Sequence, residues 1–302
     1  MVSGSLTPVF GAGQLYGLDA RAGLASTLYS INTSTGAATP IGAGVGFSGC
    51  GAMDYDTVSK KMYAICGNVS GSNGPWQLIT INLATGQGTL VATITGSLAK
   101  NVADMSFRSD NTLFIITGSL DTGGSLLTLN KLTGFSTFVG STLSAWGNGM
   151  AFSQSDTLFH SAGIENGVGL NTLNPLNAVE SAITGYTYVG FPSLGNERMN
   201  AFDFMPGSNV LFGTLAESSR TLAYLTTIDP NTAVVTNIGV TNGGLDAIAF
   251  VLDVVVGGEF LPIDTTALML AGLQSSAIWM LPILAGAAGV GTFYIKTRMN
   301  KD

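Results

Sequence analysis

A short segment of alternating apolar and hydroxyl residues recurs five times along the chain, and this repeat limits the possible folds more than any other feature. Each copy begins with a leucine and runs through Thr, Ser or Asn between Ile or Leu to an Asn or Asp. The leucines are Leu28, Leu78, Leu126, Leu170 and Leu225. Repeats of roughly 40 to 50 residues that carry several strands each are typical of propeller blades.

Each copy predicts a hairpin, because the alternating residues form a strand and the Asn or Asp caps a turn into the next strand. Two further strands precede it in each repeat. One has an aromatic second residue, as in Leu113-Phe114, and the other ends in an aromatic anchor with an apolar residue two positions earlier, as in Met105 and Phe107. Each repeat therefore contains four strands.

The two ends of the repeat array complement each other. The chain begins without an anchor strand, whereas the last anchor strand, residues 245–251, has no blade after it. Pairing this strand with the first blade would close the ring and remove two open sheet edges. We therefore predict an all-β fold, a five-bladed β-propeller over residues 14–256 with a short segment 1–13 before it. A β-solenoid or a pair of sandwiches is the alternative, but a solenoid repeats at a shorter period.

Composition excludes some partners. Only 10% of the residues are charged and the net charge is −7, so the chain lacks the basic stripe that nucleic acid requires. Residues 1–13 have no basic segment followed by an apolar run and are not expected to be a signal peptide.

The two cysteines flank a predicted hairpin. Cys50 and Cys66 lie at equal distances from Val58, so a hairpin that is symmetric about this residue places them opposite each other. A cross-strand disulfide is predicted, which would indicate an oxidising compartment. The alternative is two buried thiols, since a shift of one residue puts the side chains on opposite faces.

The C-terminal part differs from the propeller. After a linker at 257–266, residues 265–295 contain no charged residue, and about 20 apolar residues suffice to span a bilayer. We predict a transmembrane helix within 267–295. The basic tail 296–302 would lie in the cytoplasm and the propeller outside. A buried core helix is the alternative, but a propeller offers no place for it.

The same region carries a family resemblance. The run Glu259-Phe260-Leu261-Pro262-Ile263-Asp264-Thr265-Thr266, with the later Trp279-Met280-Leu281-Pro282, resembles the C-terminal anchor of surface proteins of ammonia-oxidising (thaumarchaeal) archaea. The repeats resemble those of secreted bacterial and archaeal propellers of unassigned function. The resemblance implies a location at the cell surface and implies no activity.

One row of polar residues is a candidate binding site. Four residues before the anchor aromatics stand Gly51, Ala103, Asn148, Asn200 and Asp246, and Asp104 lies beside this row. Equivalent positions of successive blades surround the central channel. Asp104, Asn148, Asn200 and Asp246 are therefore a candidate site for a divalent cation such as calcium, or for sugar hydroxyls. Such residues also cap loops, which is the alternative.

Other chemistry has little support in the sequence. The chain has one histidine, His160, within a strand, and no nucleophile elbow, phosphate-binding loop or His-rich metal pattern. Asn32 and Asn68 stand in sequons for N-glycosylation. No cofactor is expected apart from the cation.

These features suggest three functions. The first is a membrane-anchored surface module that binds a glycan, an envelope protein or another cell. The second is an extracellular propeller hydrolase or lyase that acts on polysaccharide, for which fold analogy is the only support. The third is a structural component of the envelope.

Ring closure generates a test. A chain that ends at Gly244 lacks the last anchor strand and should lose cooperative unfolding, whereas a chain that ends at Gly258 should remain folded. Thermal unfolding followed by circular dichroism distinguishes the two. Equal melting of both products would contradict closure by the last strand.

Overall fold

The computed structural model describes residues 13–20, 24–67, 75–98, 101–118, 124–142, 149–162, 169–192, 194, 197–217 and 222–252. The chain divides into two compact units, of which Phe10–Val254 is the propeller. The predicted linker 257–266, transmembrane helix 267–295 and tail 296–302 lie outside the described residues. In the described part, no helix is long and apolar enough to cross a membrane.

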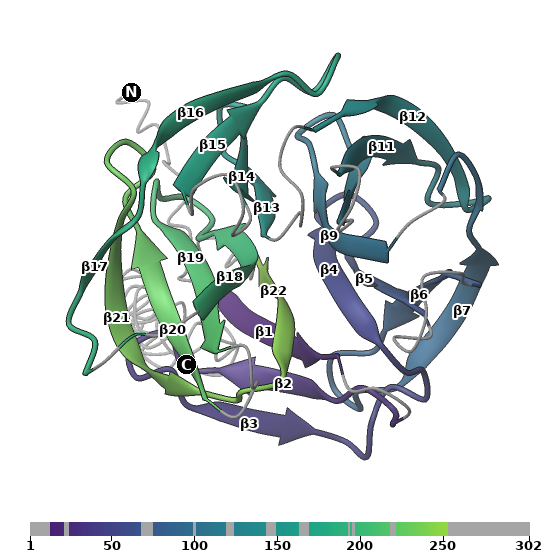
Figure 1. Cartoon of the computed structure of the whole chain (residues 1–302). Coiled ribbons are helices and arrows are strands. Elements are labelled where there is room, and N and C mark those ends of the chain that lie inside the picture. The colour runs from purple at the N-terminus through teal and green to yellow at the C-terminus, as the bar shows by residue number, and fades with distance from the viewer. Residues whose placement is uncertain are drawn as a thin grey trace, which may run out of the picture. The chain divides into compact units, whose positions relative to one another are not determined.

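Five antiparallel sheets of four main strands form the blades, which confirms the predicted propeller (Figure 1). From the innermost strand outward, blade 1 contains β22 (Leu245–Val251), β1 (Gln14–Asp19), β2 (Leu28–Ile31) and β3 (Ala38–Ile41). Blade 2 contains β4 (Cys50–Asp56), β5 (Lys61–Cys66), β6 (Gln77–Ile81) and β7 (Gly88–Thr93). Blade 3 contains β9 (Asn101–Phe107), β10 (Leu113–Gly118), β11 (Ser125–Leu129) and β12 (Phe135–Ser141). Blade 4 contains β13 (Met150–Phe152), β14 (Leu158–Ala162), β15 (Gly169–Leu173) and β16 (Glu180–Gly185). Blade 5 contains β18 (Glu197–Phe204), β19 (Leu211–Glu217), β20 (Ala223–Ile228) and β21 (Val234–Thr241).

Two short strands extend the outer edges of blades 3 and 5. β8 (Thr95–Gly96) pairs in parallel with β12, and β17 (Thr187–Val189) pairs in parallel with β21. Each belongs to the segment that leaves the outer strand of the preceding blade. These segments cover edges that would otherwise be open.

The ring closes as predicted. β22 pairs antiparallel with β1, from Gln14 opposite Val251 to Asp19 opposite Leu245. Blade 1 is therefore built from both ends of the propeller segment, so the ring cannot open without breaking a strand ladder.

Aromatic pairs join successive blades. The aromatic residue in the second strand of a blade contacts the anchor aromatic in the innermost strand of the next blade, with ring centroids 5.2–5.8 Å apart. The pairs are Tyr63 with Phe107, Phe114 with Phe152, Phe159 with Phe204, and Phe212 with Phe250. Five clusters of buried apolar residues lie between neighbouring blades and form the core. The two repeating aromatic positions are thus the two halves of one interblade contact.

The capped turn between the third and fourth strands is confirmed and has a second role. The side-chain oxygen of Asn82 accepts hydrogen bonds from the N–H groups of Ala84 (2.9 Å) and Thr85 (3.2 Å). The turn ends at Gly86, whose φ of 72° suits glycine. A Cβ there would lie 2.3 Å from the carbonyl oxygen of Ile41 in blade 1. Each capped turn therefore packs against the outer strand of the preceding blade.

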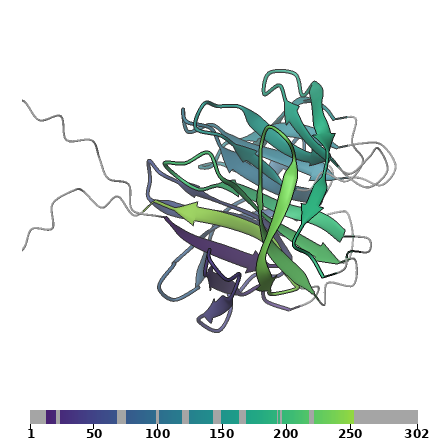
Figure 2. The same ribbon diagram turned by 90° about the vertical axis from the view of Figure 1, so that its left-hand side faces the viewer.

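The connections lie on two opposite faces, because the four strands of a blade alternate in direction. The first we call the turn face. It carries the hairpin turns 56–61, 107–113, 152–158 and 204–211 and the capped turns 32–36, 82–86, 130–134, 174–178 and 229–233. The opposite loop face carries the connections between second and third strands and those that enter the next blade. In Figure 2, β22 (yellow-green) ends and β1 (purple) begins on the left, which is the turn face.

Gly86 tests this packing. Gly86→Ala should destabilise the protein by at least about 2 kcal/mol, since the left-handed conformation alone costs an L-residue roughly 1–2 kcal/mol. Gly51→Ala is the matched control, because its Cβ would meet nothing closer than the Val102 carbonyl oxygen at 3.8 Å. Denaturant unfolding of both variants gives the comparison. Equal stability of the two would show that the turn does not hold the blades together.

Candidate functional site

The polar row identified in the sequence coincides with a repeated β-bulge near the start of the innermost strands. In four blades the strand ladder skips one residue at this position. The skipped residues are Gly51, Ala103, Asn200 and Asp246. The equivalent residue in blade 4, Asn148, lies outside the described residues. A bulge adds one residue to a strand, so the side chains before it point to the opposite sheet face from the one that simple alternation predicts.

The bulge in blade 2 also makes the disulfide possible. Asp56 pairs with Lys61, so an unbroken ladder would place Cys66 opposite Gly51. Because the ladder skips Gly51, Cys66 pairs with Cys50, and the two buried cysteines are joined by a disulfide. The predicted bond is confirmed, but it depends on a bulge and not on a symmetric hairpin.

Only part of the candidate binding row comes together. The side-chain nitrogen of Asn200 donates a hydrogen bond of 3.1 Å to the carboxylate of Asp246 in the neighbouring blade. Asp104 is buried and accepts hydrogen bonds from the backbone N–H groups of Met105 and Met150, each at 2.8 Å. Among the described residues, no group of three or more His, Cys, Asp or Glu side chains could hold a metal ion. A cation at this row stays a prediction.

Three axial carboxylates bind the innermost strand of the next blade. Besides Asp104 in blade 3, Asp54 in blade 2 accepts a hydrogen bond of 2.6 Å from the N–H of Phe107. Asp203 in blade 5 accepts one of 2.5 Å from the N–H of Phe250. An innermost strand has no sheet neighbour on its axial side, so some of its N–H groups need other acceptors. These carboxylates supply them.

Burial changes the ionisation of this group. It raises the pKa of Asp54 to about 7, against the lowering effect of its backbone hydrogen bonds. Burial also raises the pKa of Asp104 and Asp203 well above the usual range, and the charge of Asp54 adds to both effects. The three side chains therefore form one electrostatically linked cluster near the axis.

Sequence reasoning missed this cluster. Simple alternation places Asp54 and Asp203 on the strand face opposite to the residues four before the anchor aromatics, so the candidate row does not include them. Asp104 and Ser106 both bind backbone N–H groups of blade 4, so the −1 and −3 positions before the anchor aromatic share one face. The recurrence of Asp, Ser or another small residue at those positions was the available signal.

His160 lies inside a blade, within the strand that the sequence predicts. It is completely buried in β14, and burial lowers its pKa to about 4, so the ring is neutral at pH 7. Neither ring nitrogen has a hydrogen-bond partner among the described residues. In the described part of the chain no hydrogen bond links the ring to a nucleophile or carboxylate, although the charge of Glu180 acts on it.

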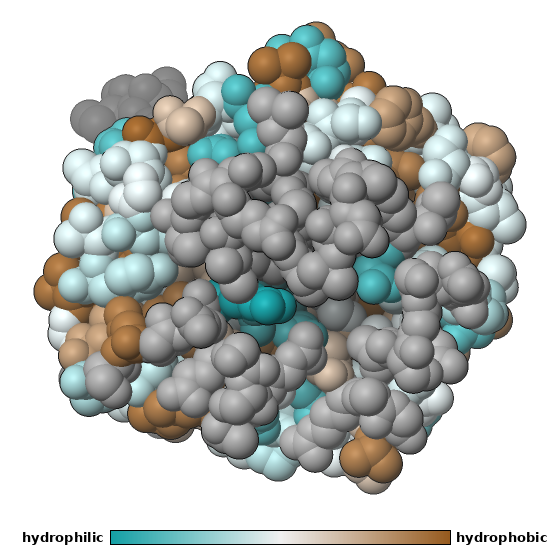
Figure 3. Space-filling model, viewed as in Figure 1, coloured by the Kyte–Doolittle hydropathy of each residue, from teal (hydrophilic) through white to brown (hydrophobic). Residues whose placement is uncertain are grey.

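On the face shown in Figure 3, strongly hydrophilic residues lie near the middle of the ring. Asn32, one of the two sequon residues, is exposed, and its side-chain oxygen caps the turn at Ser34. Asn68 lies outside the described residues.

Asp54 gives a pH-dependent test. Its carboxyl keeps its proton up to about pH 7 in the folded protein and ionises near its ordinary pKa in the unfolded chain. The raised pKa therefore contributes to the free energy of unfolding. This contribution is fully present when the pH lies below the ordinary pKa, and it is lost as the pH rises through about 7. Asp54→Asn cannot ionise, so it should gain roughly 2–4 kcal/mol relative to the wild type between pH 5 and pH 8.

Denaturant unfolding at several pH values measures this difference. Asp229→Asn is the control, because backbone hydrogen bonds lower the pKa of Asp229 and its contribution changes only in acid. Parallel pH profiles for the wild type and Asp54→Asn would show that the Asp54 carboxyl is not perturbed.

Comparisons with known proteins find only distant structural likenesses. No protein-family model and no curated protein sequence match this chain. Among solved structures, the periplasmic gluconolactonase of Pseudomonas aeruginosa is 10% identical with a TM-score of 0.49, over 77% of this chain and 83% of that one. A Bacteroides thetaiotaomicron protein of unknown function is 18% identical with a TM-score of 0.48, over 67% and 53%. This chain spans about half the length of the latter. At such identities and TM-scores the likeness carries no conclusion about activity.

Proposed function

We propose that this protein is a membrane-anchored surface module whose propeller binds a partner outside the cytoplasm. In this proposal a helix within 267–295 spans the membrane. The tail 296–302 lies in the cytoplasm, and the propeller lies outside it.

The Cys50–Cys66 disulfide is the observation that carries the location. Both cysteines are buried, and the described residues contain no other cysteine. Structural disulfides form and persist in oxidising compartments, whereas most cytoplasms keep thiols reduced. The positive-inside rule supports the same orientation, because Lys296, Arg298 and Lys301 follow the apolar segment.

Binding without turnover agrees best with the axial carboxylates. A glycosidase needs two carboxyl groups that face the substrate across a cleft. Asp54, Asp104 and Asp203 are instead hydrogen-bonded to backbone N–H groups of neighbouring blades. Their raised pKa values follow from burial, which is also found at structural sites.

The partner we propose is a surface glycan or an envelope protein. The chain is 10% charged, and its outer strands carry Thr, Ser and Gly beside exposed apolar residues such as Phe135, Phe138 and Val240. Such a surface offers many hydroxyl and backbone hydrogen-bonding groups and little charge for electrostatic attraction. A structural role in the envelope is the second form of the same proposal, and an ordered lattice without a soluble ligand would distinguish it.

Protease treatment of intact cells tests the location. Added protease should remove the propeller and leave a membrane-bound fragment of a few kilodaltons, detected with an antibody against the tail 296–302. A cytoplasmic marker protein serves as the control for cell integrity. If the propeller is cut only after the membrane is opened, the proposed orientation is wrong.

Incubation of the purified protein with a panel of polysaccharides tests the function. We expect retention on one or more of them without release of reducing ends. Turnover that is lost in Asp54→Asn and Asp203→Asn would favour the hydrolase instead.

A further inference from the structure

The turn face differs from the rest of the propeller in one respect that the proposed function does not explain. The three most exposed large apolar side chains of the described residues are Leu176 (80%), Leu132 (75%) and Val58 (68%). All three lie at the tips of turns on this face, in 174–178, 130–134 and 56–61. Turn tips normally carry polar residues, so exposed apolar side chains at three turn tips of one face require an explanation.

Most basic residues in the described part of the chain lie on the same face. Among the described residues the basic ones are Lys60, Lys61, Arg108, Lys131 and Arg198. All except Arg198 lie in turns of blades 2 and 3 on the turn face, although the chain as a whole has a net charge of −7. Four of the five described basic residues thus lie on one face, where they make the local potential more positive than the net charge alone implies.

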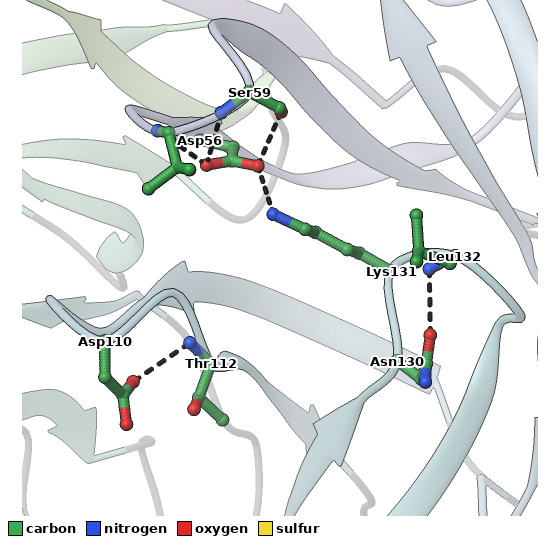
Figure 4. A network of polar contacts seen from close by, with 8 residues as sticks. Asp56, Ser59, Asp110, Thr112, Asn130, Lys131 and Leu132 are labelled. Carbon is green, nitrogen blue, oxygen red and sulfur yellow. Dashed lines mark hydrogen bonds and ion pairs between the residues drawn. The ribbon is translucent and has the colours of Figure 1, made fainter.

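The apolar and basic residues form one patch. Lys131 in blade 3 makes an ion pair with the buried Asp56 in blade 2, whose carboxylate also accepts hydrogen bonds from Val58 and Ser59 (Figure 4). This contact ties turn 56–61 to turn 130–134. Val58, Lys60, Lys61 and Leu132 therefore lie on two joined turns, and we call these four residues the basic apolar patch.

Two acidic residues of the adjoining turns are ion-paired. Asp56 is paired with Lys131, and Asp110 is paired with Arg108. Lys60 and Lys61 are exposed and have no ion-pair partner within the described residues. The patch thus presents two uncompensated positive charges beside two exposed apolar side chains.

The chain also leaves the propeller on this face. β22 ends at Val251 on the turn face, and the uncharged segment 265–295 begins fourteen residues later in the sequence. A linker of this length keeps the face from which it starts close to the membrane, if that segment spans it.

We propose that the basic apolar patch docks on the anionic lipid surface of the membrane in which the protein is anchored. Lys60 and Lys61 would interact with lipid phosphates, while Val58 and Leu132 insert between the headgroups. Docking holds the propeller with its loop face outward, toward the partner. This inference rests on the proposed membrane anchoring and adds which face meets the bilayer and by what chemistry.

Site-specific fluorescence in nanodiscs tests the docking. Single cysteines introduced as Val58→Cys, Leu132→Cys and, on the opposite face, Leu24→Cys in the full-length protein are labelled with one fluorophore. Leu24 is 61% exposed and serves as the matched control. With a nitroxide on the headgroup of anionic lipids, the first two labels should lose more than about half of their emission, and the Leu24→Cys label should keep it.

The charge requirement is tested by combining Leu132→Cys with Lys60→Glu and Lys61→Glu. Quenching should fall to the level of the Leu24→Cys control, and it should also fall in nanodiscs of uncharged lipids or at high salt. Unchanged quenching under these conditions would overturn the role of anionic lipid. Melting temperatures of the labelled variants confirm that these exposed substitutions leave the fold intact.

The remaining outcomes separate the two proposals. Failure of the full-length protein to enter nanodiscs contradicts the anchoring itself. Entry with equal quenching at all three positions, or with quenching at Leu24→Cys alone, overturns the docking and leaves the anchoring standing. Self-quenching of the Leu132→Cys label in lipid-free detergent would show that a second copy of the chain covers the patch, which also overturns it.

Discussion

The contact between neighbouring blades is the interaction on which the structure depends. A single four-stranded blade exposes an apolar surface on both sides, and it becomes stable when a neighbour covers each side. Five buried clusters and the recurring aromatic pairs provide that cover. Ring closure through β22 and β1 ensures that no blade lacks a neighbour.

Packing the blades around one axis leaves polar backbone groups near that axis without a strand partner. Innermost strands converge there and keep backbone N–H groups that no further strand can satisfy. Asp54, Asp104 and Asp203 accept some of these hydrogen bonds, and burial raises their pKa. Carboxylates at a propeller axis are therefore not by themselves a sign of catalysis. Their hydrogen bonds must be assigned before a reaction is inferred.

The turn face and the loop face of the propeller differ in structure. Neighbouring turns on the turn face are linked to one another, for example by the hydrogen bonds from Ser109 to Asp156 and the ion pair between Lys131 and Asp56. This face also receives the chain ends of the propeller and carries the basic apolar patch. The loop face has the longer connections, which can vary without disturbing the blades. A propeller that docks by one face and binds by the other would use this division.

The spacing of the sequence repeats, and the positions of the first and last repeated strands, were enough to predict the architecture. The leucine repeat, the two aromatic positions and the unmatched last strand are local patterns, so blade number, strand number and ring closure followed from the sequence. The capped turns followed as well, because Asn and Asp act on their own backbone within three residues.

The details around the axis depended on tertiary structure. A bulge of one residue at Gly51, Ala103, Asn200 and Asp246 cannot be read from alternation, yet it reverses the facing of every residue on one side of it. It brings Cys50 opposite Cys66. The carboxyl groups of Asp54, Asp104 and Asp203 lie beyond the bulge and meet backbone N–H groups of the next blade, which only the closed ring places beside them. The basic apolar patch likewise joins residues far apart in the chain through the Asp56–Lys131 pair. The sequence determined the ring because its signals are local, whereas the sites depend on contacts between blades, which only the folded structure defines.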